Sequence, residues 1–238
     1  MPTAFVAGAT GYVGREVVRS LRARGHRAVA HVRPDSPRLD EWRARFAALG
    51  AEVDATPWDE GAMADTLRRL RPDALFALLG TTRARGRAAA RRGGAETYES
   101  VDYALTALLL RAARAAAADT GVAPRFVYLS SAGVRPGTRN LYLAARSRLE
   151  DELRAGGLPF TVARPGFITG PDREESRPAE RLVAAATDAV LAVAALLGAR
   201  TLRDRWRSTT GRALADALVR VAFDPAMAER VITGEELR

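Results

Sequence analysis

Short apolar segments alternate with amphipathic stretches along most of the chain. In residues 4–7 and 73–80 apolar side chains dominate, as in parallel strands that are covered on both faces. In residues 98–119 they recur instead at the spacing of an amphipathic helix. Further strands are predicted at residues 26–32, 51–56, 125–130, 159–163 and 230–232. This alternation predicts an α/β fold, a doubly wound parallel sheet of the Rossmann type with right-handed crossovers.

The carboxyl-terminal part of the chain is predicted to form a small substrate lobe within one domain. The 238 residues suit a single domain, and residues 165–238 are expected to contribute the lobe, with a helix at 210–222. Residues 179–198 are nearly all Ala, Val and Leu, but Thr187 and Asp188 interrupt them. A membrane helix needs about 20 apolar residues in succession. We therefore expect this stretch to wall the substrate pocket or contact another subunit, and no transmembrane segment is expected.

Composition removes several classes of function. The chain has no cysteine and two histidines, so neither a disulfide framework nor a histidine-based metal site is expected. It also has no lysine, and all 37 basic side chains are arginine, which give a net charge of +9. The use of arginine at every basic position indicates a coding bias, and the excess arginines are interpreted as a solvated surface. Nucleic-acid binding is therefore not expected. Residues 83–94 carry five arginines and are interpreted as a disordered loop, with a phosphate-seeking lid as the alternative.

No secretory signal precedes the first predicted strand, which begins close to Met1. A cytoplasmic location is therefore expected.

Three glycines follow the first predicted strand at the spacing Gly-x-x-Gly-x-x-Gly, and a helical pattern follows them. In a dinucleotide site Gly8 permits the tight turn, Gly11 lets the diphosphate approach the backbone, and Gly14 lets the helix pack on its strand. The diphosphate then lies on amides at the positive end of the helix. The alternative is a glycine-rich turn without a ligand, but its position between a strand and a helix favours the nucleotide site.

Arg33 closes the second predicted strand, 19 residues after Gly14. In this fold that position meets the adenosine ribose, where a guanidinium pairs with a 2′-phosphate and a carboxylate binds a free hydroxyl. NADP is therefore favoured over NAD, and nearby Asp35 keeps NAD as the alternative. Asp59, after the third strand, either accepts from the adenine amino group or caps the following helix.

Polar side chains after the fifth predicted strand suggest acid–base chemistry. Tyr142 and Arg146 are four residues apart and hence neighbours on one helical face. A free phenol has a pKa of about 10, and an adjacent cation lowers it by stabilising the phenolate. Ser131, or its neighbour Ser130, could hold a substrate carbonyl. With a nicotinamide above the sheet these groups suffice for carbonyl reduction or alcohol oxidation; the alternative is a chance pairing of a tyrosine and an arginine.

These motifs together resemble those of the atypical short-chain dehydrogenase/reductases. The resemblance is closest to the Tat-interacting oxidoreductase group, with the NmrA-like proteins more distant, and it extends from the first strand to about Leu182. It is carried by the glycine turn, Leu-Ser-Ser at 129–131, Asn-Leu-Tyr-Leu at 140–143, Arg-Pro-Gly at 164–166, and the more specific Leu-Gly-Thr-Thr-Arg at 79–83 and Glu-Ser-Arg-Pro at 175–178. It implies an NADP-binding Rossmann fold with a Tyr-x-x-x-Lys pair as proton donor and ribose anchor.

The resemblance and the residue chemistry together give one predicted site. The catalytic residues are expected to be Tyr142, Ser131 and Arg146. The expected cofactor contacts lie in the glycine turn and at the ends of later strands: Gly8, Thr10, Gly11, Tyr12, Val13, Gly14, Arg33, Asp59, Leu79, Gly80, Thr81, Pro165, Ile168 and Arg177.

Arg146 stands where the family has lysine. An arginine stays protonated and can present a charge or bond a ribose, but it does not pass a proton onward. The prediction is therefore an NADP-dependent oxidoreductase acting on a small carbonyl or alcohol. The alternative is an NADP-binding regulator that senses redox state and signals to a protein partner.

Overall fold

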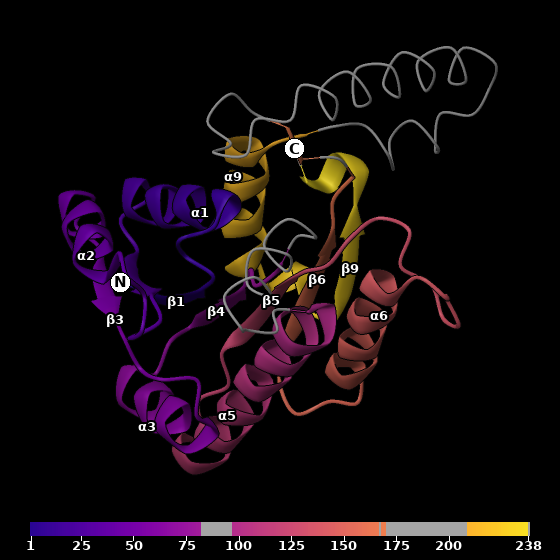
Figure 1. Ribbon diagram of the computed structural model, residues 1–238, viewed down its shortest axis with the longest axis horizontal. Helices are drawn as coiled ribbons and strands as arrows, with labels where there is room; N and C mark the ends of the chain where they lie inside the picture. Colours follow the sequence, from indigo (N-terminus) through magenta and orange to yellow (C-terminus); the bar gives the residue numbers. More distant parts are fainter. Residues whose placement is uncertain (82–96, 167, 170–208, 238) are drawn as a thin grey trace.

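The computed structural model describes residues 1–81, 97–166, 168–169 and 209–237. Their main feature is a seven-stranded sheet in the order β3-β2-β1-β4-β5-β6-β9 (Figure 1). All six pairings within it are parallel. The sequence prediction of a doubly wound parallel sheet is confirmed. Successive strands are added on one side of β1 as far as β3 and on its other side from β4 onward, so the strand order reverses between β1 and β4.

The main sheet consists of β1 (Thr3–Ala7), β2 (Arg27–His31), β3 (Glu52–Asp54), β4 (Ala74–Ala77), β5 (Arg125–Leu129), β6 (Phe160–Arg164) and β9 (Arg230–Thr233). A separate pair of two-residue strands, β7 (Ile168–Thr169) and β8 (Thr209–Thr210), is also parallel. At the centre, Phe5 of β1 lies between Val29 of β2 and Leu75 of β4. All three are buried, which explains why these strands read as continuous apolar runs.

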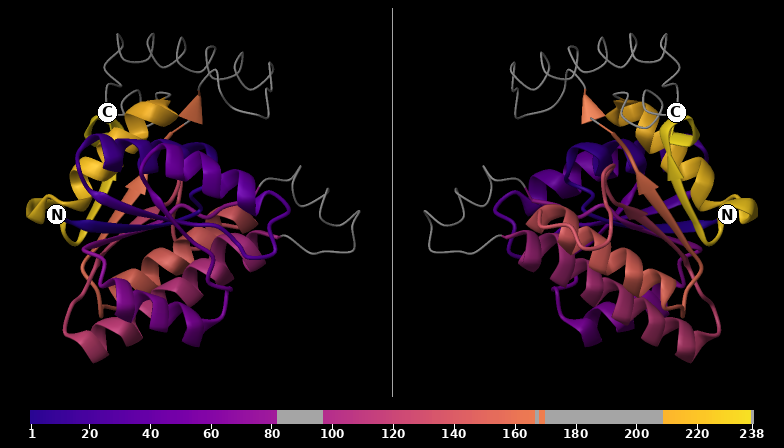
Figure 2. Two further views of the ribbon diagram at one scale, coloured as in Figure 1. Left: turned by 90° about the vertical axis from the view of Figure 1, so that its left-hand side faces the viewer. Right: turned by 90° about the vertical axis from the view of Figure 1, so that its right-hand side faces the viewer.

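Helices cover both faces of the sheet (Figure 2). They are α1 (Tyr12–Ala23), α2 (Leu39–Ala48), α3 (Glu60–Leu70), η1 (Tyr98–Ala104), α5 (Leu105–Thr120), α6 (Leu141–Arg154) and α9 (Gly211–Ala222), with short 3₁₀ turns η2 (Pro225–Met227) and η3 (Gly234–Leu237). The apolar stripes of α1, α2 and α9 form one buried cluster. Those of α3, α5 and α6 form the other, on the opposite face.

Short polar side chains fix where three of these helices begin. Asp59 accepts the Ala62 amide at the start of α3, and Asn140 accepts the Leu143 amide at the start of α6. Thr210 does the same for α9 by accepting the amide of Ala213. Each cap satisfies a backbone N–H that has no partner inside its helix. The cap that the sequence offered as one role for Asp59 is thus observed.

The first seven residues of the predicted helix at 98–119 are not α-helical. η1 is a π-helix, and the α-helical hydrogen bonding starts only at Leu105. π-helical turns are rare and are frequent at functional sites. The apolar periodicity of the sequence did not indicate it.

The described part of the carboxyl-terminal third belongs to the main body of the fold. Helix α9 packs beside α1 in the same buried cluster, and β9 pairs with β6 as the last strand of the sheet. The arginine-rich segment 83–94, the apolar stretch 179–198 and Arg177 lie outside the described residues. Within the part that is described, no helix is both long and apolar enough to span a membrane.

Candidate dinucleotide and acid–base site

The predicted site residues lie on segments that follow the strands of the main sheet. Because these strands are parallel, their carboxyl ends meet at one edge, where open α/β sheets bind their ligands. The glycine turn follows β1, Arg33 follows β2 and Asp59 follows β3. Leu79, Gly80 and Thr81 follow β4, Ser131 follows β5, and Pro165 follows β6. The fold therefore brings to one edge segments as far apart in the chain as Gly8 and Pro165.

Two of the three glycines are required by contacts inside the protein. Gly8 has a φ of +83°, and a Cβ there would lie 2.7 Å from the carbonyl oxygen of Leu78. A Cβ on Gly14 would lie 2.1 Å from the carbonyl oxygen of Gly8. Both distances are too short for any side chain. The predicted tight turn is thus seen, and Gly14 lets α1 pack closely on the turn that follows β1 rather than on the strand itself.

Gly11 differs from the other two. Its φ of −71° is open to any residue, and a Cβ would meet only the Gly8 carbonyl oxygen, at 3.2 Å, among the described atoms. It is also the N-cap of α1, where no side chain caps the helix and no acidic residue stands in the first turn. The protein itself makes little demand for glycine here, which leaves a bare amino end of a helix facing this edge of the sheet.

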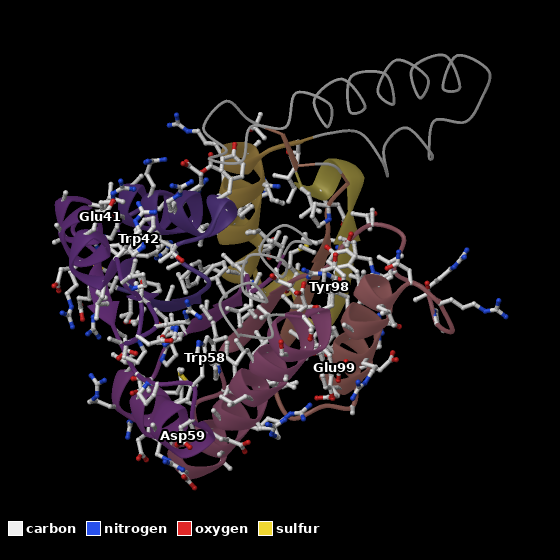
Figure 3. All side chains as sticks on the ribbon, in the orientation of Figure 1. Glu41, Trp42, Trp58, Asp59, Tyr98 and Glu99 are labelled. Atoms are coloured by element: carbon white, nitrogen blue, oxygen red, sulfur yellow. The ribbon has the colours of Figure 1, made fainter. Side chains whose placement is uncertain are left out.

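The segments after β2 and β3 carry both charged and aromatic groups. The Arg33 guanidinium is about half exposed and lies 3.7 Å from the Asp35 carboxylate. Trp58 comes just before Asp59 (Figure 3) and makes an edge contact with the His31 ring at a centroid distance of 4.8 Å. His31 is buried, and its Nε2 donates to the Thr56 carbonyl at 2.8 Å. Burial lowers the pKa of His31, so the ring is neutral near pH 7.

Tyr142 lies between a second tyrosine and an arginine. The Tyr98 ring contacts it edge-on at a centroid distance of 5.2 Å, and the Arg146 guanidinium lies 4.7 Å from the centre of its ring. Tyr98, labelled in Figure 3, comes from η1, so this contact joins η1 to the first turn of α6. The predicted neighbourhood of Tyr142 and Arg146 on α6 is therefore present, with the cation over the aromatic ring.

Arg146 points into the protein and is only 5% exposed. Its Nη2 donates to Oδ1 of Asp102 at 2.8 Å, and its Nη1 donates to the Leu129 carbonyl and lies 3.5 Å from the Tyr128 hydroxyl. Both terminal nitrogens are thus engaged by the protein. The family resemblance implied that Arg146 binds the cofactor ribose, but the hydrogen bonds of Nη1 and Nη2 within the protein do not support that role.

The groups around Arg146 shift one another's ionisation. Burial acts to lower the pKa of Arg146, but Tyr128, Tyr142 and Asp102 together raise it above its ordinary value. Burial raises the pKa of Asp102, against the opposing charge of Arg146 and the hydrogen bond from Thr81. Burial likewise raises the pKa of Tyr128, which is fully enclosed. Arg146 therefore stays charged, and Tyr128 stays protonated, across the physiological range.

The two adjacent serines have different surroundings. The Ser130 hydroxyl is buried and donates to Glu150 at 2.6 Å, and Glu150 also accepts from Arg164 and Arg154. The Ser131 hydroxyl is half-buried and, among the described residues, donates to the neighbouring Ala132 carbonyl at 3.2 Å. Ser130 is therefore part of an internal network, and the Ser131 hydroxyl is not.

Two features of the site were not recognised in the sequence. Asp102 is fully buried and joins Arg146 to the amide of Thr81, which donates to Oδ2 at 2.9 Å. The signal was an acidic residue on the inner face of the predicted helix, four residues before the buried Thr106. The other is a hydrogen bond between two segments that were each expected at the site: the Pro165 carbonyl accepts the Ala132 amide at 2.9 Å, which ties the segment after β6 to the Ser131 segment.

A parallel sheet in this order, with a glycine turn between β1 and α1, defines a Rossmann-type dinucleotide-binding protein. The family model described as NAD(P)H-binding matches residues 8–197, and the chain belongs to that family. The atypical, short-chain dehydrogenase-like character expected from the motifs is confirmed at this level. The family match does not distinguish NADP from NAD.

Curated relatives cover most of the chain. The protein fmp52-1 of Aspergillus oryzae is 31% identical over 99% of this chain and 92% of its own length. The corresponding protein of Aspergillus terreus is 34% identical over 76% of this chain and 72% of its own.

Solved structures share the fold at low identity. A putative epimerase from Burkholderia cenocepacia has a TM-score of 0.63 at 22% identity, over 97% of this chain and 74% of its own. A UDP-N-acetylglucosamine 4-epimerase from Bacillus cereus has a TM-score of 0.64 at 14% identity, over 99% of this chain and 80% of its own.

The names of the curated relatives contradict the expected cytoplasmic location. Both Aspergillus proteins are named as mitochondrial. The sequence argument considered only an apolar secretory segment, whereas mitochondrial targeting uses amphipathic, arginine-rich segments of a different composition. The expectation of a cytoplasmic location was therefore wrong.

Proposed function

We propose that this protein is an NADP-dependent oxidoreductase that acts on a small carbonyl or alcohol. The observation that carries the proposal is the placement of Tyr142 against the charge of Arg146, on the helix that follows the Ser131 segment. This group lies at the carboxyl edge of a sheet whose family binds NAD(P)H. A proton donor and a dinucleotide site at one edge are the parts that carbonyl reduction needs.

The residues present fit the cofactor. A diphosphate would lie on the bare amino end of α1, where Gly11 leaves its side open. The Thr81 hydroxyl is buried and has no hydrogen-bond partner in the described part of the chain, so it offers a polar contact to a ligand. The remaining proposed contacts are those of the sequence prediction, including Asp59 through its second carboxylate oxygen and a wall formed by Pro165 and Ile168.

The bound nicotinamide supplies or accepts the hydride, and the chain handles the proton. Tyr142 would donate a proton to the substrate oxygen during reduction and take it back during oxidation. The Arg146 guanidinium would hold a positive charge beside the ring while the proton moves. The Ser131 hydroxyl would hold the same oxygen in place. Arg177 is proposed to face the cofactor or the substrate.

Tyr142→Phe tests this mechanism directly. We expect loss of turnover, by at least a hundredfold, in a panel of carbonyl substrates with NADPH oxidation followed by absorbance. The affinity for NADPH, measured by calorimetry, should stay within about threefold because the phenol is proposed to contact the substrate. Tyr98→Phe is the matched control, since it removes the same atom from the neighbouring ring and should retain turnover. A Tyr142→Phe variant as active as the parent would refute the mechanism.

Arg33 is proposed to pair with the 2′-phosphate of NADP. Its position after β2 and its exposure support this role, and Asp35 beside it weakens the local positive charge. Arg33→Ala should therefore lower the affinity for NADPH about tenfold and leave that for NADH nearly unchanged. Arg43→Ala, which removes an exposed arginine from α2, is the control. Equal affinity of the parent for both cofactors would contradict the preference.

One observation favours a second function, that of an NADP-sensing regulator. Arg146 is held in the interior by Asp102 and cannot pass a proton onward as a lysine could. Tight NADPH binding together with no turnover across the carbonyl panel would support this alternative, and a protein partner would then be sought.

A further inference from the structure

We propose that Asp102 is a positioning residue. Its ion pair with Arg146 holds the Arg146 guanidinium against the ring of Tyr142. The proposal rests on the proposed role of Tyr142 as the proton donor. Asp102 touches neither the substrate nor the tyrosine in this view, and its whole effect on the reaction passes through Arg146.

The contacts of Asp102 leave each of its carboxylate oxygens with one partner. Oδ1 accepts from Arg146 at 2.8 Å and Oδ2 accepts from the Thr81 amide at 2.9 Å. The carboxylate is fully buried, and the side chain of Arg146 is 6% exposed. A buried cation needs a partner of opposite charge, since its transfer out of water is costly. Among the described residues, Asp102 is the one carboxylate that forms an ion pair with Arg146.

The backbone around this pair is adapted to its presence. A Cβ on Gly80 would lie 3.2 Å from Nη2 of Arg146 and 3.4 Å from Oδ1 of Asp102. Gly80 therefore lets the segment after β4 close over the pair. The π-helical turn η1, which Thr97 and Ser100 cap reciprocally, carries Asp102 into the interior. The same turn supplies the Tyr98 ring that contacts Tyr142.

Asp102 thus connects two parts of the proposed site. Through Thr81 it fixes the segment that is predicted to contact the cofactor, and through Arg146 it fixes the face of α6 that carries Tyr142. The guanidinium makes its other bond to the Leu129 carbonyl, at the end of β5. Without Asp102, the charged group would lose its counter-ion and would gain from moving toward water, away from the Tyr142 ring.

The sign of one pH shift tests the proposal. The ionisation of Tyr142 is followed as the difference in tyrosinate absorbance between a protein and its Tyr142→Phe counterpart. If Asp102 acts through Arg146, Asp102→Asn releases the cation and moves the midpoint to higher pH by about one unit. A carboxylate that acted only as a nearby negative charge would give the opposite result, because its removal favours the phenolate.

The same substitution is then made without the arginine. In an Arg146→Gln background, Asp102→Asn should move the midpoint to lower pH, since only the direct effect of the negative charge remains. Glu99→Gln is the matched control. Like Asp102, Glu99 lies in η1, and its ion-pair partner Arg148 lies in α6 with Arg146. Unlike Asp102 and Arg146, Glu99 and Arg148 both have exposed side chains. Glu99→Gln should leave the midpoint unchanged.

A downward or absent shift for Asp102→Asn in the parent would overturn the proposal. If that variant does not fold, melting temperatures decide: the double variant Asp102→Asn/Arg146→Gln should melt above Arg146→Gln, in which a buried carboxylate is left unpaired. A lower melting temperature for the double variant would also overturn it. Neither readout needs a substrate, so absent turnover would refute the oxidoreductase function and leave this test intact.

Discussion

The glycine turn and the Tyr142 site lie at the same edge of the sheet but are built by different means. The turn is made of backbone, since Gly8 and Gly14 are fixed by carbonyl oxygens that lie within 2.7 Å and 2.1 Å of where a Cβ would be. The Tyr142 site is made of side chains from several elements. Its contacts run from Tyr98 through Tyr142 and Arg146 to Asp102.

The difference determines how each region responds to change. A turn built of backbone leaves no room for a side chain at Gly8 or Gly14, and these steric contacts do not depend on protonation. A network of buried charges accepts small changes of shape, but its stability depends on the protonation of each member. Steric substitutions should therefore affect mainly the first region, and changes of pH mainly the second.

The largest effect is expected from Gly14→Ala. The new Cβ would overlap the Gly8 carbonyl oxygen, so α1 has to move away from the turn. We expect a loss of about 3 kcal/mol or more in the free energy of unfolding, measured by urea denaturation, together with loss of NADPH binding. Gly61→Ala is the control, because its Cβ would meet only the Asp59 carboxylate at 3.4 Å within a helix. It should be neutral or stabilising by roughly 0.5 kcal/mol. Equal stability of the two variants would refute the steric account.

Glu150→Gln should produce the next largest effect and reveal the pH dependence of the network. Burial acts to raise the pKa of Glu150, but hydrogen bonds from Arg164 and Ser130 and the adjacent arginine charges lower it below its ordinary value. A lowered carboxyl pKa contributes stability above the unfolded-state pKa, about 4.5, and this stability is lost as the pH falls through the folded-state pKa. The parent should therefore lose stability on acidification.

The variant should be less stable than the parent by about 2 kcal/mol at neutral pH, since Arg164 keeps partial contact with water. The difference between the two should shrink as the pH falls from roughly 4.5 through the lowered folded-state pKa of Glu150, below which the carboxyl group of the parent is protonated in both states. Urea denaturation at a series of pH values measures both. A difference that stayed constant with pH would show that the charge of Glu150 is not what stabilises the network.

Gly11→Ala should have the smallest effect on stability, and it separates the contribution of the turn to folding from its contribution to cofactor binding. Its backbone conformation suits alanine, and its one close contact is at 3.2 Å. We expect a melting temperature close to that of the parent and an affinity for NADPH lowered about tenfold, because the methyl group stands where the diphosphate approaches. Unchanged affinity would mean that the cofactor does not lie against this residue.

The fold was predictable because its signals are local. Each strand of the main sheet was expected within three residues of its observed bounds, since buried parallel strands are continuous apolar runs. The need for Gly8 and Gly14 was also readable from their spacing. The π-helical turn was not, because the apolar spacing of residues 98–119 fits an ordinary helix and the altered hydrogen bonding depends on what packs against it.

The site was predictable only in part. Tyr142 and Arg146 were paired correctly because four residues make one turn of a helix. The direction of the Arg146 guanidinium was not readable, since Asp102 stands 44 positions away and its carboxylate meets the guanidinium only after η1 and α6 have packed together. The choice between Ser130 and Ser131 likewise depended on Glu150, which comes from the far end of α6.

By itself the sequence determined the parallel sheet, the dinucleotide turn and the spacing of the tyrosine and the arginine, because each depends on residues close together in the chain. The tertiary structure decided which polar groups are used up inside the protein: Arg146 by Asp102, Ser130 by Glu150, and one oxygen of Asp102 by the Thr81 amide. Such partners are chosen by proximity in space and by the cost of burying an unpaired charge. Neither of these is expressed in the order of residues along the chain.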